Sequence, residues 1–357
     1  MLVLCTPSPT PGVVRPGSPG IKVLEDVLYC PLRDPAVDQD PSWGIYGRDG
    51  RLAEDAAYYR GPGRALIGQS PAGTAAQAEA NAGTFVYGGV FFGHFGHFIL
   101  STLARLWPFA HSFLRSSLEP LPILFHAASD PAEWFAQDFV AEMLAGLGLP
   151  RARFVRLERT TRIRRLIVPG PSLVEMSHVH PAFIGMTRAI GAGLRAGQPD
   201  RGGPVYLSRT RLPVGTQGWG NEGALEAALR PLGVEIVHPE TMSIAERIGL
   251  FTGRPVVAGT VASAFYIALF CERPAPMVML SPSPIVNPSF GMLDEAAGQE
   301  ASYHYVESDH LGIDMRRRLW STFTLRDPAT TAGGLMRVMQ AVSRPPDERT
   351  RLAQPGA

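Results

Sequence analysis

The stretch PVYLSRTRLPVGTQGWGNEGALEAALRPLGVEIVHPETMSIAERIGLFTGRPVVAGT, residues 204–260, decides the fold. It contains three short apolar runs, PVYLSR, VEIVHPE and PVVAGT, and runs of this kind bounded by turn residues are typical of strands. The segments between them, 221–233 and 242–253, have the apolar spacing of helices. Strands that alternate with helices predict a parallel, doubly wound sheet, and residues 262–270 add a helix or a buried apolar segment.

The N-terminal half shows a similar alternation. TFVYGGV, PILFHA and RIRRLIVPG predict strands, and the segment that starts at His94 predicts a helix up to Pro108, or through it with a kink. Asp130 is placed to cap a second helix. The Gly- and Pro-containing stretch 195–204 predicts a linker. The predicted domains are therefore residues 1–195 and 204–330, both α/β, with a terminal helix and a disordered tail in 331–357.

The charge balance argues against nucleic acid as a partner. The 357 residues include 33 basic and 32 acidic ones, so the net charge is only +1. The three cysteines are odd in number and widely spaced, which favours neither a disulfide framework nor a metal cluster. A reducing cytoplasm is the expected location.

No segment predicts a membrane-spanning helix. The longest uncharged apolar run, Val256 to Cys271, is shorter than the ~20 residues that such a helix needs. The N-terminus lacks the basic region of a signal peptide. This composition is compatible with peripheral attachment to a membrane or to an assembly complex.

Ligands of open parallel sheets bind beyond the carboxyl ends of the strands, and this rule selects candidate residues. The residues that follow the three C-terminal strands are Ser208, Arg209 and Arg211; Glu240, Thr241 and Ser243; and Gly259, Thr260 and Ser263. Arginines suit a diphosphate, a carboxylate suits ribose hydroxyls, and a turn that opens a helix suits an anion. No GxxxxGK[ST] motif is present, so a nucleotide sugar fits better than phosphoryl transfer by a P-loop.

His94 and His97 form the other candidate site. Their spacing places both on one helical face, which suggests a metal, but no other histidine completes a standard zinc pattern. Alternatively, one of them is a general base, and His94, in the loop or first turn, is the more exposed choice. A third interpretation makes both histidines structural.

Residues 88–270 resemble glycosyltransferase family 61. The family pattern has a strand that ends in Ser-Arg, here Ser208 and Arg209, an Asn-Glu pair that opens a helix, here Asn221 and Glu222, and a Pro-Glu-x-x-Ser segment, here ending at Ser243. A Gly-x-x-Gly-Ser-like turn follows before an apolar helix. The segment from His94 to Leu106 resembles the family's His-aromatic helix that ends in Arg-Leu.

The resemblance implies a GT-B architecture, in which two Rossmann-like domains with parallel sheets face each other across a cleft. It implies an inverting, metal-independent glycosyltransferase that moves a sugar from a nucleotide-diphosphate donor to a glycan or polysaccharide acceptor, and the bacterial members are often encoded with capsule genes. No cofactor is expected. The 1–195 domain would serve the acceptor and the 204–330 domain the donor.

By position, Arg209 would contact the diphosphate with Arg211, Asn221 and Glu222 would shape the cleft, and Glu240 with Ser243 would hold the nucleoside. Gly259, Thr260 and Ser263 would line the donor site. The family's usual His-Gly pair stands here as Val261 and Ala262. This departure supports the alternative function, a glycosyltransferase-like protein that binds a glycan or scaffolds an assembly without catalysis, whereas the presence of Arg209, Asn221 and Glu222 speaks against it.

Overall fold

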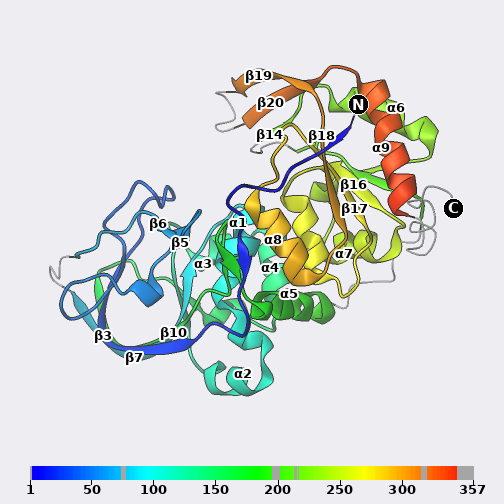
Figure 1. Cartoon of the computed structure of the whole chain (residues 1–357). Helices are drawn as coiled ribbons and strands as arrows, with labels where there is room; N and C mark the ends of the chain where they lie inside the picture. Colours follow the sequence, from blue (N-terminus) through cyan, green and yellow to red (C-terminus); the bar gives the residue numbers. More distant parts are fainter. Residues whose placement is uncertain are drawn as a thin grey trace. The chain divides into compact units, whose positions relative to one another are not determined.

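The computed structural model describes residues 2–73, 78–194, 202–212, 215, 217–314 and 320–343. The chain folds into two compact units (Figure 1). The N-terminal unit comprises Thr10–Arg195 and Gly291–Ala297, and the C-terminal unit comprises Met1–Pro9, Ala196–Phe290 and Gly298–Ala357. Most of the predicted linker, residues 195–201, and the predicted disordered tail from residue 344 lie outside the described residues.

The C-terminal unit is built on a six-stranded sheet with the order β1-β18-β17-β16-β13-β15. Its strands are β1 (Val3–Leu4), β13 (Val205–Leu207), β15 (Glu235–Val237), β16 (Val257–Thr260), β17 (Met277–Ser281) and β18 (Ala301–Tyr305). All pairs are parallel except β1 with β18. The predicted parallel sheet is confirmed, and its order reverses between β13 and β16, where open α/β sheets bind ligands.

Helical segments cover both faces of this sheet. They are α6 (Glu222–Leu229), α7 (Ile244–Gly253), the 3-10 helix Ser263–Phe270 and α9 (Pro328–Val342). Ala258 belongs to a core cluster that includes Leu225 of α6 and Leu335 of α9. A Cβ on the neighbouring Gly259 would lie 3.2 Å from the ring of Phe265, on the 3-10 helix. Because successive strand residues face opposite ways, the unit is doubly wound.

The local signals at two helices of this unit are confirmed. The Ser243 hydroxyl accepts from the Glu246 backbone N–H while the Glu246 carboxylate accepts from that of Ser243, which is the predicted capping box. Residues 262–270, predicted as a helix or buried segment, form the 3-10 helix. A small sheet of β14 (Gln217–Trp219), β19 (Ser308–Asp314) and β20 (Trp320–Leu325) adjoins these elements.

The N-terminal unit contains a mixed sheet with the order β4-β3-β10-β7-β8-β9. Its strands are β3 (Ile21–Cys30), β4 (Gly44–Tyr46), β7 (Glu79–Val90), β8 (Ile123–His126), β9 (Phe154–Val155) and β10 (Thr161–Pro169). The three strands predicted at 84–90, 122–127 and 162–170 are present and parallel. The expectation of a wholly parallel sheet is wrong here, because β3 pairs antiparallel with β10 and β4. The antiparallel strands come from residues 21–46, where turn residues obscured the pattern.

The helix predicted from His94 to Pro108 is a chain of short turns. It comprises α1 (Phe95–His97), a π-helical turn (Phe98–Thr102) and 3-10 turns (Leu103–Arg105 and Trp107–Ala110). Such π turns inside helical segments occur frequently at functional sites.

The remaining helices are α2 (Ser112–Leu118), α3 (Pro131–Phe135), α4 (Asp138–Gly146), α5 (Pro181–Gly193) and α8 (Pro288–Ala297), the last of which contributes residues to both units. Asp130 caps α3 as predicted, but the helix breaks at Ala136 and restarts as α4. Within the described ranges, no helix is long and apolar enough to cross a membrane.

Candidate functional site

The two predicted histidines lie beside each other at the carboxyl end of β7. His94 precedes α1 with an extended backbone and is exposed, whereas His97 lies within α1 and its side chain is 32% exposed. Their ring centroids are 5.3 Å apart. The pair is therefore accessible to a ligand, and the two rings differ in what holds them.

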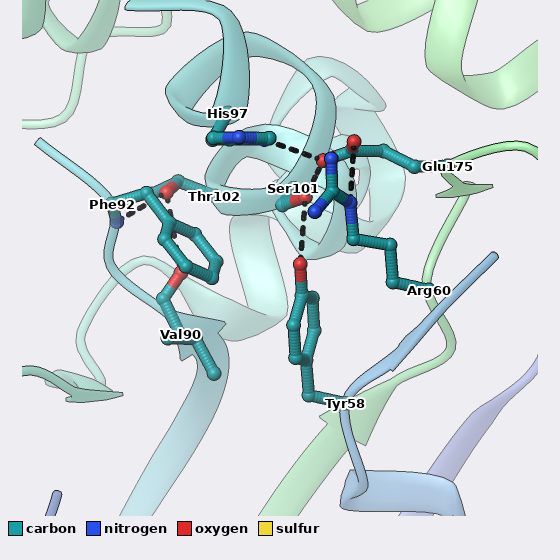
Figure 2. Close-up of polar contacts among 8 residues, drawn as sticks. All are labelled: Tyr58, Arg60, Val90, Phe92, His97, Ser101, Thr102 and Glu175. Carbon is teal, nitrogen blue, oxygen red and sulfur yellow. Dashed lines mark hydrogen bonds and ion pairs between the residues drawn. The ribbon is translucent and has the colours of Figure 1, made fainter. Parts of the chain in front are cut away.

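His97 is held by a carboxylate that sequence reasoning missed. The Nδ1 atom of His97 lies 2.9 Å from Oε1 of Glu175, a residue that follows β11 (Leu173–Val174) and is 5% exposed (Figure 2). The Ser101 hydroxyl donates to the same oxygen at 2.5 Å, and Arg60 Nε donates to Oε2 at 3.0 Å. Tyr58 Oη lies 3.4 Å from Ser101 Oγ. We call these five residues the Glu175 centre.

The charge of Glu175 is stabilised by its partners. Burial alone would raise the pKa of this carboxyl, but the His97 hydrogen bond and charge, with Arg60 and Ser101, bring the pKa below its usual value. Burial also raises the pKa of Tyr58 to about 12, so its hydroxyl stays protonated at neutral pH. Glu175 is therefore an acceptor for three donors.

The surrounding backbone keeps the Glu175 centre in place. The Thr102 hydroxyl donates to the Val90 carbonyl and accepts from the Phe92 N–H, which ties the end of β7 to the π-helical turn (Figure 2). Arg105 is 4% exposed and donates to the carbonyls of Pro169 and Ala57. Burial lowers the pKa of Arg105 to about 10. Arg105 therefore connects the end of β10 to the backbone at Ala57. The cation that pairs with Glu175 is Arg60.

This arrangement can perform base chemistry. A carboxylate that accepts from Nδ1 selects the tautomer in which Nε2 is unprotonated and can take a proton. A small pocket beside the centre is lined by residues that include Tyr58, Tyr59, Ser101 and Glu175. No group of three or more potential metal ligands gathers within the described part of the chain.

A second polar cluster lies at the carboxyl ends of β13 and β16 in the C-terminal unit. Tyr206 Oη donates to Glu222 Oε1 at 2.9 Å, and Trp219 Nε1 donates to Thr260 Oγ1 at 2.7 Å. Burial raises the pKa of Glu222 to about 7, against the lowering effect of Tyr206 and Arg209. Burial lowers the pKa of Arg209, which lies within electrostatic range of Glu222 and Glu240.

The turn after β13 is braced by a second carboxylate that sequence reasoning missed. Ser208 Oγ and Thr210 Oγ1 both donate to Glu226 Oε1, at 2.5 and 2.7 Å, and the Thr210 N–H donates to Ser208 Oγ. Glu226 is 9% exposed on α6. These bonds fix the residues on either side of Arg209, so they also fix the direction in which Arg209 leaves the strand.

The structure brings together only part of the predicted donor set. Arg209, Glu222, Glu240 and Thr260 are in or near the cluster, whereas Arg211 is exposed. The other predicted members make structural contacts or only flank the cluster. Asn221 bonds both backbone groups of Leu325, and Ser243 is engaged in its capping box. Gly259 packs against Leu207, and Ser263 begins the 3-10 helix.

Trp219 and two carboxylates show what the sequence reasoning did not find. Trp219 lies in β14 and is 5% exposed, so its indole packs in the core and donates to Thr260. Glu175 and Glu226 were overlooked because neither follows a predicted strand end. Glu175 is the only acidic residue in PSLVEMSHVH, and its direct neighbours Val174 and Met176 are apolar. An isolated carboxylate in such a stretch is the signal that could have found it, since buried acids need partners.

The comparisons with known proteins assign the family. The model of the family described as glycosyltransferase 61 matches residues 95–278, just over half of the chain. The match covers His97, Glu175 and the whole β13–α6 region, and it begins one residue after His94. No curated protein matches the chain. The predicted resemblance is thus confirmed at the level of the family: the chain belongs to glycosyltransferase family 61.

Proposed function

We propose that this protein is an inverting, metal-independent glycosyltransferase that uses a nucleotide-diphosphate sugar and a glycan or polysaccharide acceptor. The observation that carries the proposal is the hydrogen bond between Glu175 and His97, because it supplies an oriented base in a chain of a glycosyltransferase family. We further propose a GT-B architecture, in which the C-terminal unit serves the donor and the N-terminal unit the acceptor, and a cytoplasmic location.

The proposed reaction is a single displacement. His97 Nε2 takes the proton from an acceptor hydroxyl while that oxygen attacks the anomeric carbon. The bond between the anomeric carbon and the diphosphate oxygen breaks, and the nucleoside diphosphate leaves with the electron pair. Glu175 stabilises the imidazolium that forms, since its charge lies 2.9 Å from Nδ1. Inversion follows because the attack and the departure occur on opposite faces of the sugar.

The choice of His97 revises the expectation that His94 is the base. A base must be oriented as well as accessible, and the contact to a buried carboxylate orients His97. His94, 5.3 Å away between ring centroids, is then placed to contact the acceptor. This role for His94 is part of the proposal.

For the donor, we propose that Arg209 and Arg211 bind the diphosphate. Arg209 is supported by its place at the strand-order reversal and by the brace on its neighbours. Between Glu240 and Ser243, Glu240 is the better candidate for binding the ribose, since its Oε1 is buried and accepts no hydrogen bond within the described residues. The hydroxyl of Ser243 is engaged in its capping box, so its contribution would be restricted to backbone groups.

The test is a thermal-shift screen with UDP, GDP, dTDP and CDP, each with and without EDTA, because a ligand of the folded state raises the melting temperature. We expect one nucleotide to stabilise the protein without metal, and Arg209→Ala to abolish the shift. His97→Ala should keep the shift but lose sugar transfer from the matching nucleotide sugar. A shift that EDTA removes would overturn metal independence, and the absence of any shift would favour glycan binding without catalysis.

A further inference from the structure

A group of basic side chains adjoins the Glu175 centre in the N-terminal unit. It comprises Arg15, Arg64, His178 and His180, and we call it the basic cluster. Arg15 follows β2 (Val13–Val14), which pairs parallel with β12 (His178–Val179), and the Arg15 N–H donates to the Val179 carbonyl at 2.8 Å. The His178 and His180 rings are 5.7 Å apart. Three of the four residues therefore come from one small sheet.

Arg64 reaches the cluster from a hairpin that is attached to Glu175. The hairpin consists of β5 (Tyr59–Arg60) and β6 (Ala65–Leu66), and its Gly61 N–H donates to the Glu175 carbonyl at 3.0 Å. Arg60, on the same hairpin, pairs with the Glu175 carboxylate. The turn that carries Arg64 is therefore fixed to the Glu175 centre by both backbone and side chain.

The conformation of Arg64 is unusual. Its φ is 60°, in the left-handed region that a non-glycine residue rarely adopts. Its guanidinium lies 4.0 Å from the centroid of the Tyr59 ring, and its Nε is buried without a hydrogen-bond partner among the described residues. A strained residue that presents an unused donor is typical of a binding site.

The charges of the cluster are not neutralised within the protein. Burial, followed by the charges of Arg15, His180 and Arg64, lowers the pKa of His178 to about 4. Burial and Arg15 also lower the pKa of His180. In the described ranges no carboxylate forms an ion pair with Arg15 or Arg64, and the carboxylate of Glu175 is paired with Arg60. Positive charge on the two histidines is therefore disfavoured, and a bound anion would offset the charges of Arg15 and Arg64.

We propose that the basic cluster binds an anionic group of the acceptor, a carboxylate or a phosphate carried by the glycan. The site rests on the proposed function, because the Glu175 centre would then act on a hydroxyl of the same acceptor. Arg64 would supply a bidentate contact and Arg15 a second charge. Tyr59 lines the pocket beside Glu175 and lies under Arg64, which connects the anion site to the base.

Equilibrium binding without nucleotide tests the site independently of catalysis. The probes are trigalacturonate, which carries carboxylates, galactose 1-phosphate, which carries a phosphate, and neutral galactotriose. We expect one of the two anions to bind, and its affinity to fall with added salt. The anion that binds identifies the chemistry. No binding of either anion, or equal binding of galactotriose, would overturn the proposal.

Variants locate the binding. Arg64→Gly removes the guanidinium while favouring the left-handed backbone, so the turn should keep its shape. This variant and Arg15→Gln should each weaken anion binding about 10-fold, as expected for the loss of one charge-assisted contact. The matched control is Arg164→Gln, which changes an exposed arginine of β10 and should leave binding unchanged. If Arg64→Gly and Arg15→Gln bind the anion as tightly as the control variant and the unchanged protein, the proposed anion site is wrong.

The outcomes separate the two proposals. If the anion binds and Arg64→Gly weakens it, the anion site stands even when no nucleotide sugar is consumed, and only the glycosyltransferase proposal fails. If sugar transfer is observed but neither anion binds, the transferase stands and the basic cluster is not an acceptor site.

Discussion

Replacement of Glu175 by glutamine should reverse the hydrogen bonding of His97. Arg60 has only donors, so the carbonyl oxygen of the introduced amide would turn toward Arg60 and its NH₂ group toward His97. His97 Nδ1 would then have to accept, and Nε2 would carry the proton. A base in the wrong tautomer cannot take a proton from the acceptor, so a change of one atom type should be sufficient to remove base catalysis.

The expected magnitude follows from the contacts. General base catalysis contributes typically ~10²-fold or more, so kcat/KM should fall by about that factor in Glu175→Gln. Three donors now meet one carboxylate that is 5% exposed. Weakening these bonds should reduce the free energy of unfolding by about 1–3 kcal/mol. The fold should therefore survive, and activity should fall far more than stability.

The assay is a double-mutant cycle of sugar transfer with the nucleotide sugar that the thermal-shift screen identifies. If Glu175 acts only through His97, Glu175→Gln combined with His97→Ala should be no slower than His97→Ala alone. Glu158→Gln, which changes a carboxylate that is 78% exposed, is the control. Multiplicative losses in the double variant, or full activity of Glu175→Gln, would refute the orientation argument.

Three further predictions concern the C-terminal unit and the core. Glu226→Ala should raise the KM for the nucleotide sugar about 10-fold with little change in kcat, because Ser208 and Thr210 lose their acceptor; steady-state kinetics at varied donor concentration measures it. Asn221→Ala should lower the free energy of unfolding by about 1–3 kcal/mol in chemical denaturation, since both bonds to Leu325 are lost, and should leave the KM unchanged. Burial lowers the pKa of His126 to about 3, so the unfolded state binds the extra proton. His126 should therefore make stability decline from about pH 6.5 toward pH 3, by about 1.4 kcal/mol per pH unit, and a slope that is smaller by this amount in His126→Gln would confirm the source.

Local patterns were sufficient for most of the C-terminal unit. Strand and helix periodicity, with the Ser243 capping box, depends on neighbouring residues, and these elements formed where they were predicted. The same reasoning was insufficient for residues 21–46, because the antiparallel pairing of β3 with β10 joins segments more than 100 residues apart. It was also insufficient for the His94 segment. The spacing of apolar residues there predicts a helix but does not tell whether its turns are α, π or 3-10.

The sequence by itself determined the class of fold, the family resemblance and the histidine pair, because periodicity, motif order and residue type are properties of the chain. Only the tertiary structure decided which histidine is oriented and which carboxylates hold the side chains around them. Glu175 meets His97 across 78 positions, and Glu226 meets Ser208 across 18. Burial is what makes these contacts strong, since a charge removed from water must be held by the partners around it. Burial at a given residue is decided by the packing of distant segments.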